Sequence, residues 1–174
     1  MKKPIYYGLL SPFDVVRYAI AVCDVIGHGS SGYAVEMCVE TWAAESLLGQ
    51  YQDRHPEKLG VGGGQVDEGT FKWLQGKYAG TAIDDKIYKA FGIRLGDLTY
   101  SSLPHSPLAC MIFTRLRYWV VTSPIPTTRE ERDDYWKLHY NSSEGKGAPE
   151  HFIRQCRVAD VDGLLKQAMG LRQQ

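Results

Sequence analysis

The stretch Glu40-Thr41-Trp42-Ala43-Ala44-Glu45-Ser46 (residues 40–46) decides the fold, together with the later turn Gly62-Gly63-Gly64-Gln65 (residues 62–65). The first stretch lies near the end of an expected helix that runs from about residue 33 to 48 and stops at Gly49. A carboxylate on the apolar side of a helix loses hydration, which costs free energy unless the group is paired or used. The directions of the carboxylates around this helix therefore bear directly on function.

Glu45 lies on the apolar face of the expected helix. At about 100° per residue it shares the direction of Trp42, whereas Glu36 and Glu40 lie about 180° and about 140° away from it. We therefore expect Glu36 and Glu40 on the solvated face. Burial beside a tryptophan raises a carboxyl pKa, and an acid that keeps its proton near neutral pH can donate it to a leaving-group oxygen. Followed by a glycine-rich turn ending in Gln65, Glu45 indicates a site that cleaves a sugar bond.

The composition favours one globular domain. The chain has 174 residues, enough for a hydrophobic core, and its 20 Lys+Arg balance its 20 Asp+Glu. Bulk charge therefore gives no indication of a nucleic-acid partner. No apolar run approaches the roughly 18 residues that span a membrane, so we expect no membrane partner. Pro12 and Asp14 interrupt the apolar stretch near the start, and we expect no signal peptide.

The cysteines and histidines show no metal-binding spacing. The four cysteines form no C-x-x-C pair and lie in apolar helical contexts, which favours buried free thiols and synthesis in a reducing compartment. They are Cys23, Cys38, Cys110 and Cys156. The five histidines are equally scattered. We expect neither a metal nor a cofactor.

The remaining sequence predicts a mainly helical chain with a small lobe of loops or strands around residues 50–66. Ser11 and Pro12 are typical of an N-cap and the first helical position, and the stretch 128–131 is typical of a capping box. Pro56 and the glycines near it favour loops or a β-hairpin. Further helices are expected at about residues 67–78, 82–91, 95–100, 108–121, 128–140, 150–157 and 161–171.

Three motifs, in this order, resemble those of the lysozyme-like lytic transglycosylases. Residues 43–46 (Ala43-Ala44-Glu45-Ser46) resemble the Glu-Ser helix of that group, and residues 62–65 resemble its Gly-x-x-Gln turn. In this chain glycines occupy positions 63 and 64, where the group usually has bulky apolar residues. Residues 139–145, His139-Tyr140-Asn141-Ser142-Ser143-Glu144-Gly145, resemble its Ala-Tyr-Asn-Ala-Gly block.

A closer resemblance is to small lysozyme-like proteins of tailed bacteriophages and prophages. The residues that carry it are Arg117-Tyr118-Trp119, the block Tyr135-Trp136-Lys137-Leu138-His139-Tyr140-Asn141, and Gly145-Lys146-Gly147. The resemblance covers about residues 40–156. It implies a mainly α, lysozyme-like α+β fold. Residues 1–174 would form a single domain, with an N-terminal helical extension (1–32) and a catalytic core (33–171).

The resemblance also implies an activity and a role for each matching residue. The expected substrate is the peptidoglycan glycan strand, cleaved at the β-1,4 bond between N-acetylmuramic acid and N-acetylglucosamine. Glu45 would be the catalytic acid, with Ser46 binding substrate or orienting it. Gln65 would hydrogen-bond a sugar, Tyr140 would hydrogen-bond and position Glu45, and Asn141 would bind sugar or cap the loop.

Two chemistries remain open at this stage. In a lytic transglycosylase, one glutamate protonates the bond and then acts as base, so that the muramic acid 6-hydroxyl gives a 1,6-anhydro product. In a hydrolytic muramidase, a second carboxylate takes part, and the candidates are Asp53, Glu57 and Asp67. We expect the single-acid route. Trp119 is expected in the core, and core packing is favoured over sugar stacking for Trp42, Trp73 and Trp136.

Other functions remain as alternatives. The chain could be a non-catalytic glycan-binding or structural virion protein of lysozyme fold, or could cleave chitin. The retained Glu45 favours the enzyme. The protein would be a monomer made in the host cytoplasm that acts on the periplasmic cell wall. It would do so as an endolysin or as a virion component beside other phage virion proteins.

Overall fold

The computed structural model describes residues 3–54, 59–141 and 149–172, which form a mainly helical fold with one small antiparallel sheet. The α-helices of these residues are α1 (Pro12–Ile26), α2 (Ala34–Ser46), α3 (Glu68–Tyr78), α4 (Ala82–Phe91), α5 (Pro107–Trp119), α6 (Arg129–His139), α7 (Pro149–Val158) and α8 (Val161–Arg172). The sheet pairs β1 (Gly60–Val61) with β2 (Val66–Asp67). Two short 3₁₀ helices, η1 (Leu95–Asp97) and η2 (Tyr100–His105), connect α4 to α5.

Several helices begin where the sequence predicted. The Asp14 carboxylate of α1 accepts hydrogen bonds from the backbone N–H groups of Leu10 and Ser11, at 2.8 and 2.9 Å. Asp67 caps α3 by accepting a 2.8 Å bond from the Thr70 N–H. At the start of α6, the Thr128 hydroxyl accepts a bond from the Glu131 N–H. These local bonds satisfy N–H groups that have no partner inside a helix.

The short helix expected at residues 95–100 is instead split into η1 and η2. Glycine at position 96 weakens a helix there, and Pro104 inside η2 has no N–H to donate. Leu95 and Leu103 are still fully buried, one in each segment. Burial of these two leucines therefore holds the connection against the core without a regular α-helix.

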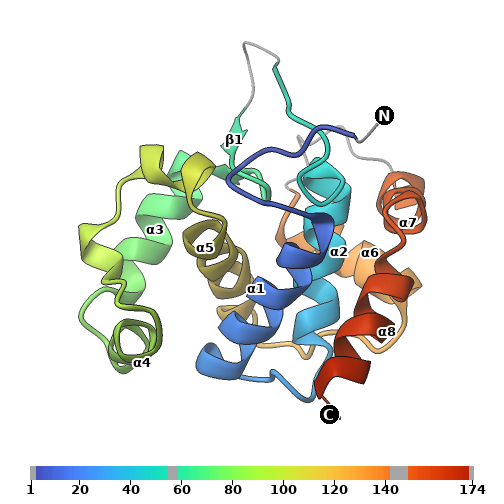
Figure 1. Cartoon of the computed structure of the whole chain (residues 1–174). Helices are drawn as coiled ribbons and strands as arrows, with labels where there is room; N and C mark the ends of the chain where they lie inside the picture. The colour runs from blue at the N-terminus through green and yellow to red at the C-terminus, as the bar shows by residue number, and fades with distance from the viewer. Residues whose placement is uncertain (1–2, 55–58, 142–148, 173–174) are drawn as a thin grey trace.

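α2 lies at the centre of the molecule. Figure 1 shows it with α1 on one side and α6, α7 and α8 on the other, and it also contacts α5. All residues of α2 are buried except Glu36 and Glu45. A helix covered on nearly all sides has no continuous solvated face, so the direction of a side chain around α2 does not decide whether that side chain is exposed.

The expectation that Glu40 is solvated was wrong. Glu40 is fully buried and accepts two bonds from Arg132, at 2.7 and 2.8 Å, and one from Arg129 at 2.9 Å. Arg129 also binds Asp162 of α8, at 2.6 and 3.0 Å. Glu36 is half-buried. Burial of the Glu40 carboxylate is possible because both arginines of α6 surround it.

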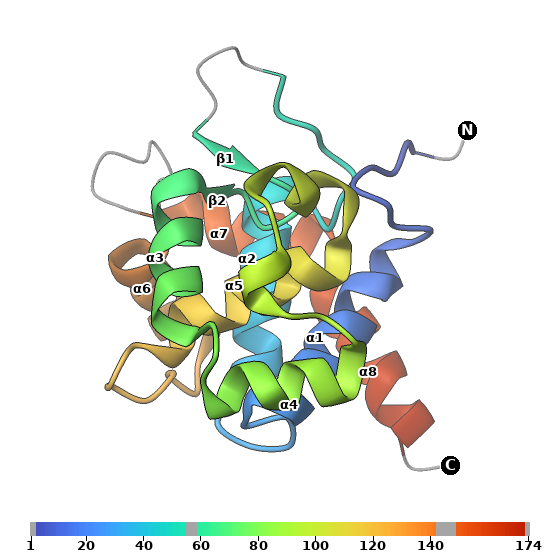
Figure 2. The same cartoon turned by 90° about the vertical axis from the view of Figure 1, so that its left-hand side faces the viewer.

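The remaining elements complete the core around α2 and α5. α1 packs against both, and Val15, Val16, Ala19 and Val22 are fully buried, so this helix belongs to the common core. Figure 2 shows α3 and α4 in front of α5, with the β1–β2 hairpin above them. Among the described residues, no helix has the length and apolar character needed to cross a membrane.

Candidate active site

Glu45 lies in the last turn of α2 and is half-buried as a residue. The indole Nε1 of Trp136 donates a 3.1 Å hydrogen bond to Glu45 Oε1. Burial raises the pKa of Glu45 to about 7, and the bond from Trp136 offsets part of this rise. Burial disfavours the charged form, whereas a donor to the carboxylate favours it. Glu45 is therefore an acid that changes its charge near neutral pH.

The backbone after Glu45 is held in an unusual turn. Leu47, Leu48 and Gly49 all have left-handed backbone angles, with φ of 52°, 55° and 81°. The N–H groups of Leu47 and Leu48 bond the carbonyls of Ala43 and Trp42, at 3.0 and 3.1 Å. Such a conformation is uncommon for leucine, and uncommon backbone conformations gather at functional sites. The end of the helix that carries Glu45 is thus fixed in one position.

Trp136 is the partner of Glu45 that sequence reasoning missed. It lies in α6, is 1% exposed and packs on Phe152 of α7 with ring centroids 5.3 Å apart. The sequence identified it as core and as part of the Tyr-Trp-Lys block. Its core position is confirmed. Which acceptor its N–H reaches depends on how α6 packs on α2, and no local pattern carries that information.

The turn of the hairpin packs against α2. Gly60 pairs with Asp67 and Val61 with Val66, so the turn comprises residues 62–65. A Cβ atom at position 63 would overlap the ring of Trp42. One at position 64 would lie 2.9 Å from Trp42 Nε1 and 2.5 Å from the Thr114 hydroxyl. Glycines are therefore required at positions 63 and 64, because Trp42 and Thr114 fill the space that side chains would occupy.

Tyr140 does not hydrogen-bond Glu45, contrary to the role expected for it. Its hydroxyl donates a 2.6 Å bond to the Gly64 carbonyl and lies 3.4 Å from the Thr114 hydroxyl. Burial raises the Tyr140 pKa, and the charge of Glu45 is among the smaller contributions, after that of Cys110. Tyr140 is thus a neutral neighbour of Glu45 that fixes the glycine turn to α6.

A buried polar network joins these elements beneath Glu45. The Trp42 indole donates to the Thr114 hydroxyl at 3.0 Å, and the Thr41 and Tyr118 hydroxyls lie 2.7 Å apart. Tyr118 stacks on Tyr140 with ring centroids 5.4 Å apart. Because the buried hydroxyl and indole groups are bonded to one another, α2, α5 and the hairpin are held in one register.

The other residues assigned to substrate are placed differently. Ser46 is 1% exposed, and its hydroxyl donates to the Trp42 carbonyl (3.2 Å) and accepts from the Gly49 N–H (3.0 Å). Its observed bonds are thus those of a turn residue. The Gln65 amide is half-buried and donates to the Gly62 carbonyl at 2.8 Å. The Asn141 N–H bonds the Trp136 carbonyl at 2.9 Å.

The three candidates for a second carboxylate are not gathered beside Glu45. Asp67 is bound to Thr70 as the cap of α3. Asp53 lies near Tyr7, whose pKa it affects through a backbone bond and its charge. Glu57 falls outside the described residues. Among the described residues, no carboxylate contributes to the raised pKa of Glu45.

A small surface depression lies beside the hairpin turn. Gln65, Asp67, Arg117 and Tyr140 are among its lining residues. The Arg117 guanidinium lies 5.6 Å from the ring centre of Trp73, which is 48% exposed. Trp42 and Trp136 are buried, as favoured, but the favoured core position of Trp73 was wrong. The expected core residue Trp119 is half-buried, with Arg115 5.0 Å from its ring centre.

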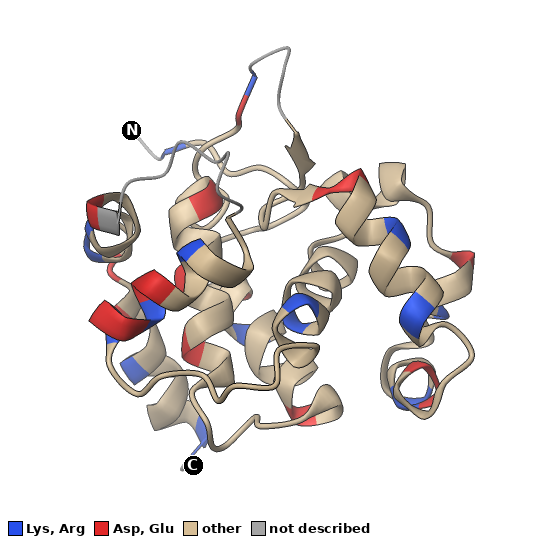
Figure 3. Ribbon diagram, turned by 180° about the vertical axis from the view of Figure 1, so that it is seen from behind, with Lys and Arg blue, Asp and Glu red and all other residues tan. Residues whose placement is uncertain are grey.

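The described residues contain no group of three or more His, Cys, Asp or Glu side chains placed to hold a metal ion. All four cysteines are free and buried. Charges of both signs are mixed along α6 rather than grouped (Figure 3). Within these residues, the group at this site best suited to proton transfer is Glu45.

Comparison with protein-family models, curated proteins and solved structures finds no match for this chain. The site offers a carboxyl group with a pKa of about 7, followed directly by a turn with left-handed backbone angles. Such a group can act as a general acid, and after giving up its proton as a general base.

Proposed function

We propose that this protein is a peptidoglycan-cleaving enzyme of lysozyme-like fold in which Glu45 protonates the glycosidic oxygen between N-acetylmuramic acid and N-acetylglucosamine. The observation that carries the proposal is the carboxyl group of Glu45, whose pKa burial raises to about 7. Efficient acid catalysis needs a pKa near the operating pH. The Glu-Ser, Gly-Gln and Tyr-Trp-Lys motifs support peptidoglycan as the substrate.

The single-acid route fits the surroundings of Glu45 better than hydrolysis. Glu45 transfers its proton to the glycosidic oxygen, and the bond from the anomeric carbon to that oxygen breaks. The resulting carboxylate accepts the proton of the muramic acid 6-hydroxyl, whose oxygen bonds the anomeric carbon and gives a 1,6-anhydro product. Support comes from the absence, among the described residues, of a carboxylate that contributes to the Glu45 pKa.

The surrounding residues have supporting roles in this mechanism. Trp136 stabilises the carboxylate form through its 3.1 Å bond, which favours release of the Glu45 proton in the first, acid-acting step. Gln65 and Arg117 line a small surface depression and offer polar groups to a sugar, and the exposed Trp73 beside Arg117 offers an aromatic surface. The enzyme would reach the cell wall as an endolysin or as a virion component.

The test uses purified protein and a peptidoglycan suspension. We expect wild type to clear the suspension and Glu45→Gln to lose this activity while keeping its helical circular dichroism spectrum. Glu130→Gln is the matched control. Glu130 is exposed in the first turn of α6, and its substitution also replaces a carboxylate by a neutral amide. Full activity of Glu45→Gln, or no clearing by wild type, would overturn the proposal and favour a binding or structural protein.

Mass spectrometry of the released muropeptides distinguishes the two chemistries. The single-acid route gives 1,6-anhydro ends without consuming water. A hydrolytic muramidase gives reducing ends and requires a second catalytic group, which would direct attention to Asp53 and to Glu57. Chitin fragments released at a comparable rate would instead show that the substrate is not restricted to muramic acid.

A further inference from the structure

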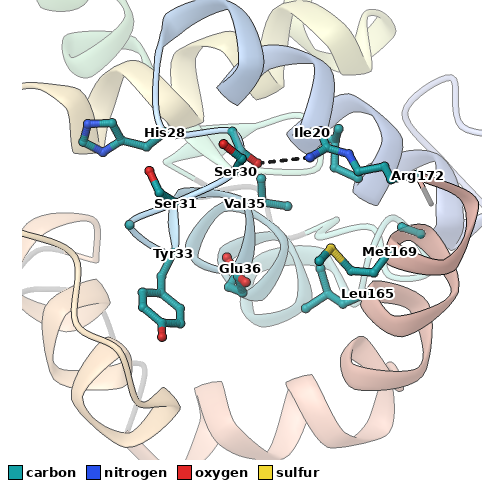
Figure 4. A pocket seen from close by; sticks show the side chains of 13 residues that line it. Ile20, His28, Ser30, Ser31, Tyr33, Val35, Glu36, Leu165, Met169 and Arg172 are labelled. Carbon is teal, nitrogen blue, oxygen red and sulfur yellow. Dashed lines mark hydrogen bonds between the residues drawn. The ribbon is translucent and has the colours of Figure 1, made fainter.

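A cavity of about 420 Å³ lies at the opposite end of α2 from Glu45. Its walls come from α1, from the loop between α1 and α2, from the first turn of α2 and from α8 (Figure 4). Glu36, which lines it, precedes Glu45 by nine residues, or about 13 Å along a helix axis. The volume lies in the range of about 300–1,000 Å³ that small-molecule sites occupy. The cavity is therefore separate from the candidate active site.

The walls of this cavity are largely apolar. Ile20 of α1, Val35 of α2, and Leu165 and Met169 of α8 supply aliphatic or thioether surface. Met169 is 57% exposed, and its flexible side chain adapts to different ligand shapes. These side chains suit a ligand with a short apolar body.

One carboxylate, that of Glu36, belongs to the cavity lining. Figure 4 shows Glu36 between Tyr33 and Leu165. Glu36 is half-buried, and within the described part of the chain its side chain takes part in no hydrogen bond or ion pair. An acid in this position attracts a cation, and partial desolvation strengthens that attraction.

The two arginines near the cavity are already engaged. Arg172, at the rim, binds the Asp24 carboxylate at 2.8 Å and the Gly29 carbonyl at 3.4 Å. Arg132, which senses the charge of Glu36, is bound to the carboxylate of Glu40. Neither guanidinium is thus available to neutralise Glu36 by direct contact, so the negative charge remains open to a ligand.

The loop that forms the rim is held in an uncommon conformation. His28 and Tyr33 both line the cavity, and both have left-handed backbone angles, with φ of 68° and 57°. This region is rare for bulky side chains and persists only where the surroundings enforce it. Tyr33 packs its ring against the Arg132 guanidinium at 5.5 Å. The rim is therefore shaped before a ligand arrives.

We propose that this cavity binds a small primary amine with an apolar body. The ammonium group pairs with the Glu36 carboxylate, and the apolar body packs on Val35, Leu165 and Met169. A carboxylate ligand of the same size is repelled by Glu36, and a neutral one gains only the apolar contact. This site does not depend on peptidoglycan cleavage.

Three six-carbon probes test the proposal by calorimetry and chemical-shift mapping: n-hexylamine, 1-hexanol and hexanoate, all at neutral pH. We expect the amine to bind about fivefold more tightly than the alcohol, as for a partly exposed ion pair, and hexanoate to bind most weakly. Chemical-shift changes should centre on Val35, Leu165 and Ala168 rather than on Glu45.

Two variants and one control identify the groups responsible. Glu36→Gln should lower amine affinity to that of the alcohol, and Met169→Trp, at an exposed position, should fill the cavity and weaken all three probes. Glu130→Gln should leave the order unchanged. Glu36 also lies in the first turn of α2, where an acid favours the helix dipole. If Glu36→Gln lowers stability but preserves the preference for the amine, or if hexanoate binds best, the proposal is wrong.

Discussion

The carboxyl group of Glu45 should be required for activity, and its ionised form should lower the stability of the folded protein. Its folded-state pKa of about 7 lies above the ordinary value of 4.5, so its protonated form favours folding at low pH. That contribution is present below about pH 4.5 and is lost as the pH rises through 7. Glu45→Gln keeps a neutral side chain at every pH. We expect it to be inactive, as stable as wild type near pH 4.5, and more stable above pH 7.

The expected gain in the free energy of unfolding above pH 7 is about 1–2 kcal/mol, because the half-buried carboxylate keeps part of its hydration. Urea denaturation of both proteins at pH 4.5 and 8 measures it. Activity of wild type should fall as the pH rises through about 7, as the acid loses its proton. Equal stability of the two proteins at pH 8 would contradict the burial of a reactive carboxyl.

Trp136→Phe removes the indole N–H that Glu45 accepts and keeps an aromatic ring in its place. The indole N–H stabilises the ionised form of Glu45, so its removal should raise the Glu45 pKa further and move the basic limb of the pH–rate profile to higher pH. Phe152→Leu is the control, because it loosens the packing around Trp136 and keeps the N–H. A lower stability in both variants with a moved limb only in Trp136→Phe supports the hydrogen bond. An unmoved limb in both would show that Trp136 has a packing role alone.

At the scale of elements, the hairpin turn depends on the absence of a side chain at position 63. A Cβ there overlaps the Trp42 ring, and both groups belong to buried parts of rigid elements. Gly63→Ala should therefore destabilise the fold by about 1–3 kcal/mol and lower activity by moving the turn. Gly76→Ala in α3 is the matched control, with no atom within 4 Å of the added Cβ. It should stabilise the protein by about 0.5–1 kcal/mol, measured by thermal unfolding.

The elements also show which information is local in the sequence. Helix starts at Ser11, Asp67 and Thr128 could be predicted because each depends on bonds within four residues. The apolar direction of Glu45 followed from its spacing to Trp42. The bond from Tyr140 to Gly64 could not be predicted, because it joins groups 76 positions apart whose approach is decided by packing.

In the molecule as a whole, α2 connects three features: the candidate active site, the cavity that Glu36 lines, and the buried ion pairs of Glu40 with Arg129 and Arg132. Glu45 lies at one end of this helix, Glu36 at the other and Glu40 between them. The sequence could not place Glu40, because its partners Arg129 and Arg132 are 89 and 92 positions away. The complete burial of Glu40, at 0% exposure, can be predicted only when the arginines that surround it in the fold are known.

The cluster of Glu40, Arg129, Arg132 and Asp162 holds α2, α6 and α8 together. Glu40→Gln leaves Arg132, which is 5% exposed, with a buried charge and no carboxylate partner, and we expect a loss of about 3–5 kcal/mol in the free energy of unfolding. Asp162→Asn removes an acid from the same cluster, but its side chain is 78% exposed, so the loss should be about 1 kcal/mol or less. Urea denaturation of both variants measures the difference. Similar losses in the two would mean that the cluster acts as a surface ion pair, and that apolar packing around α2 supplies the cohesion of α2, α6 and α8.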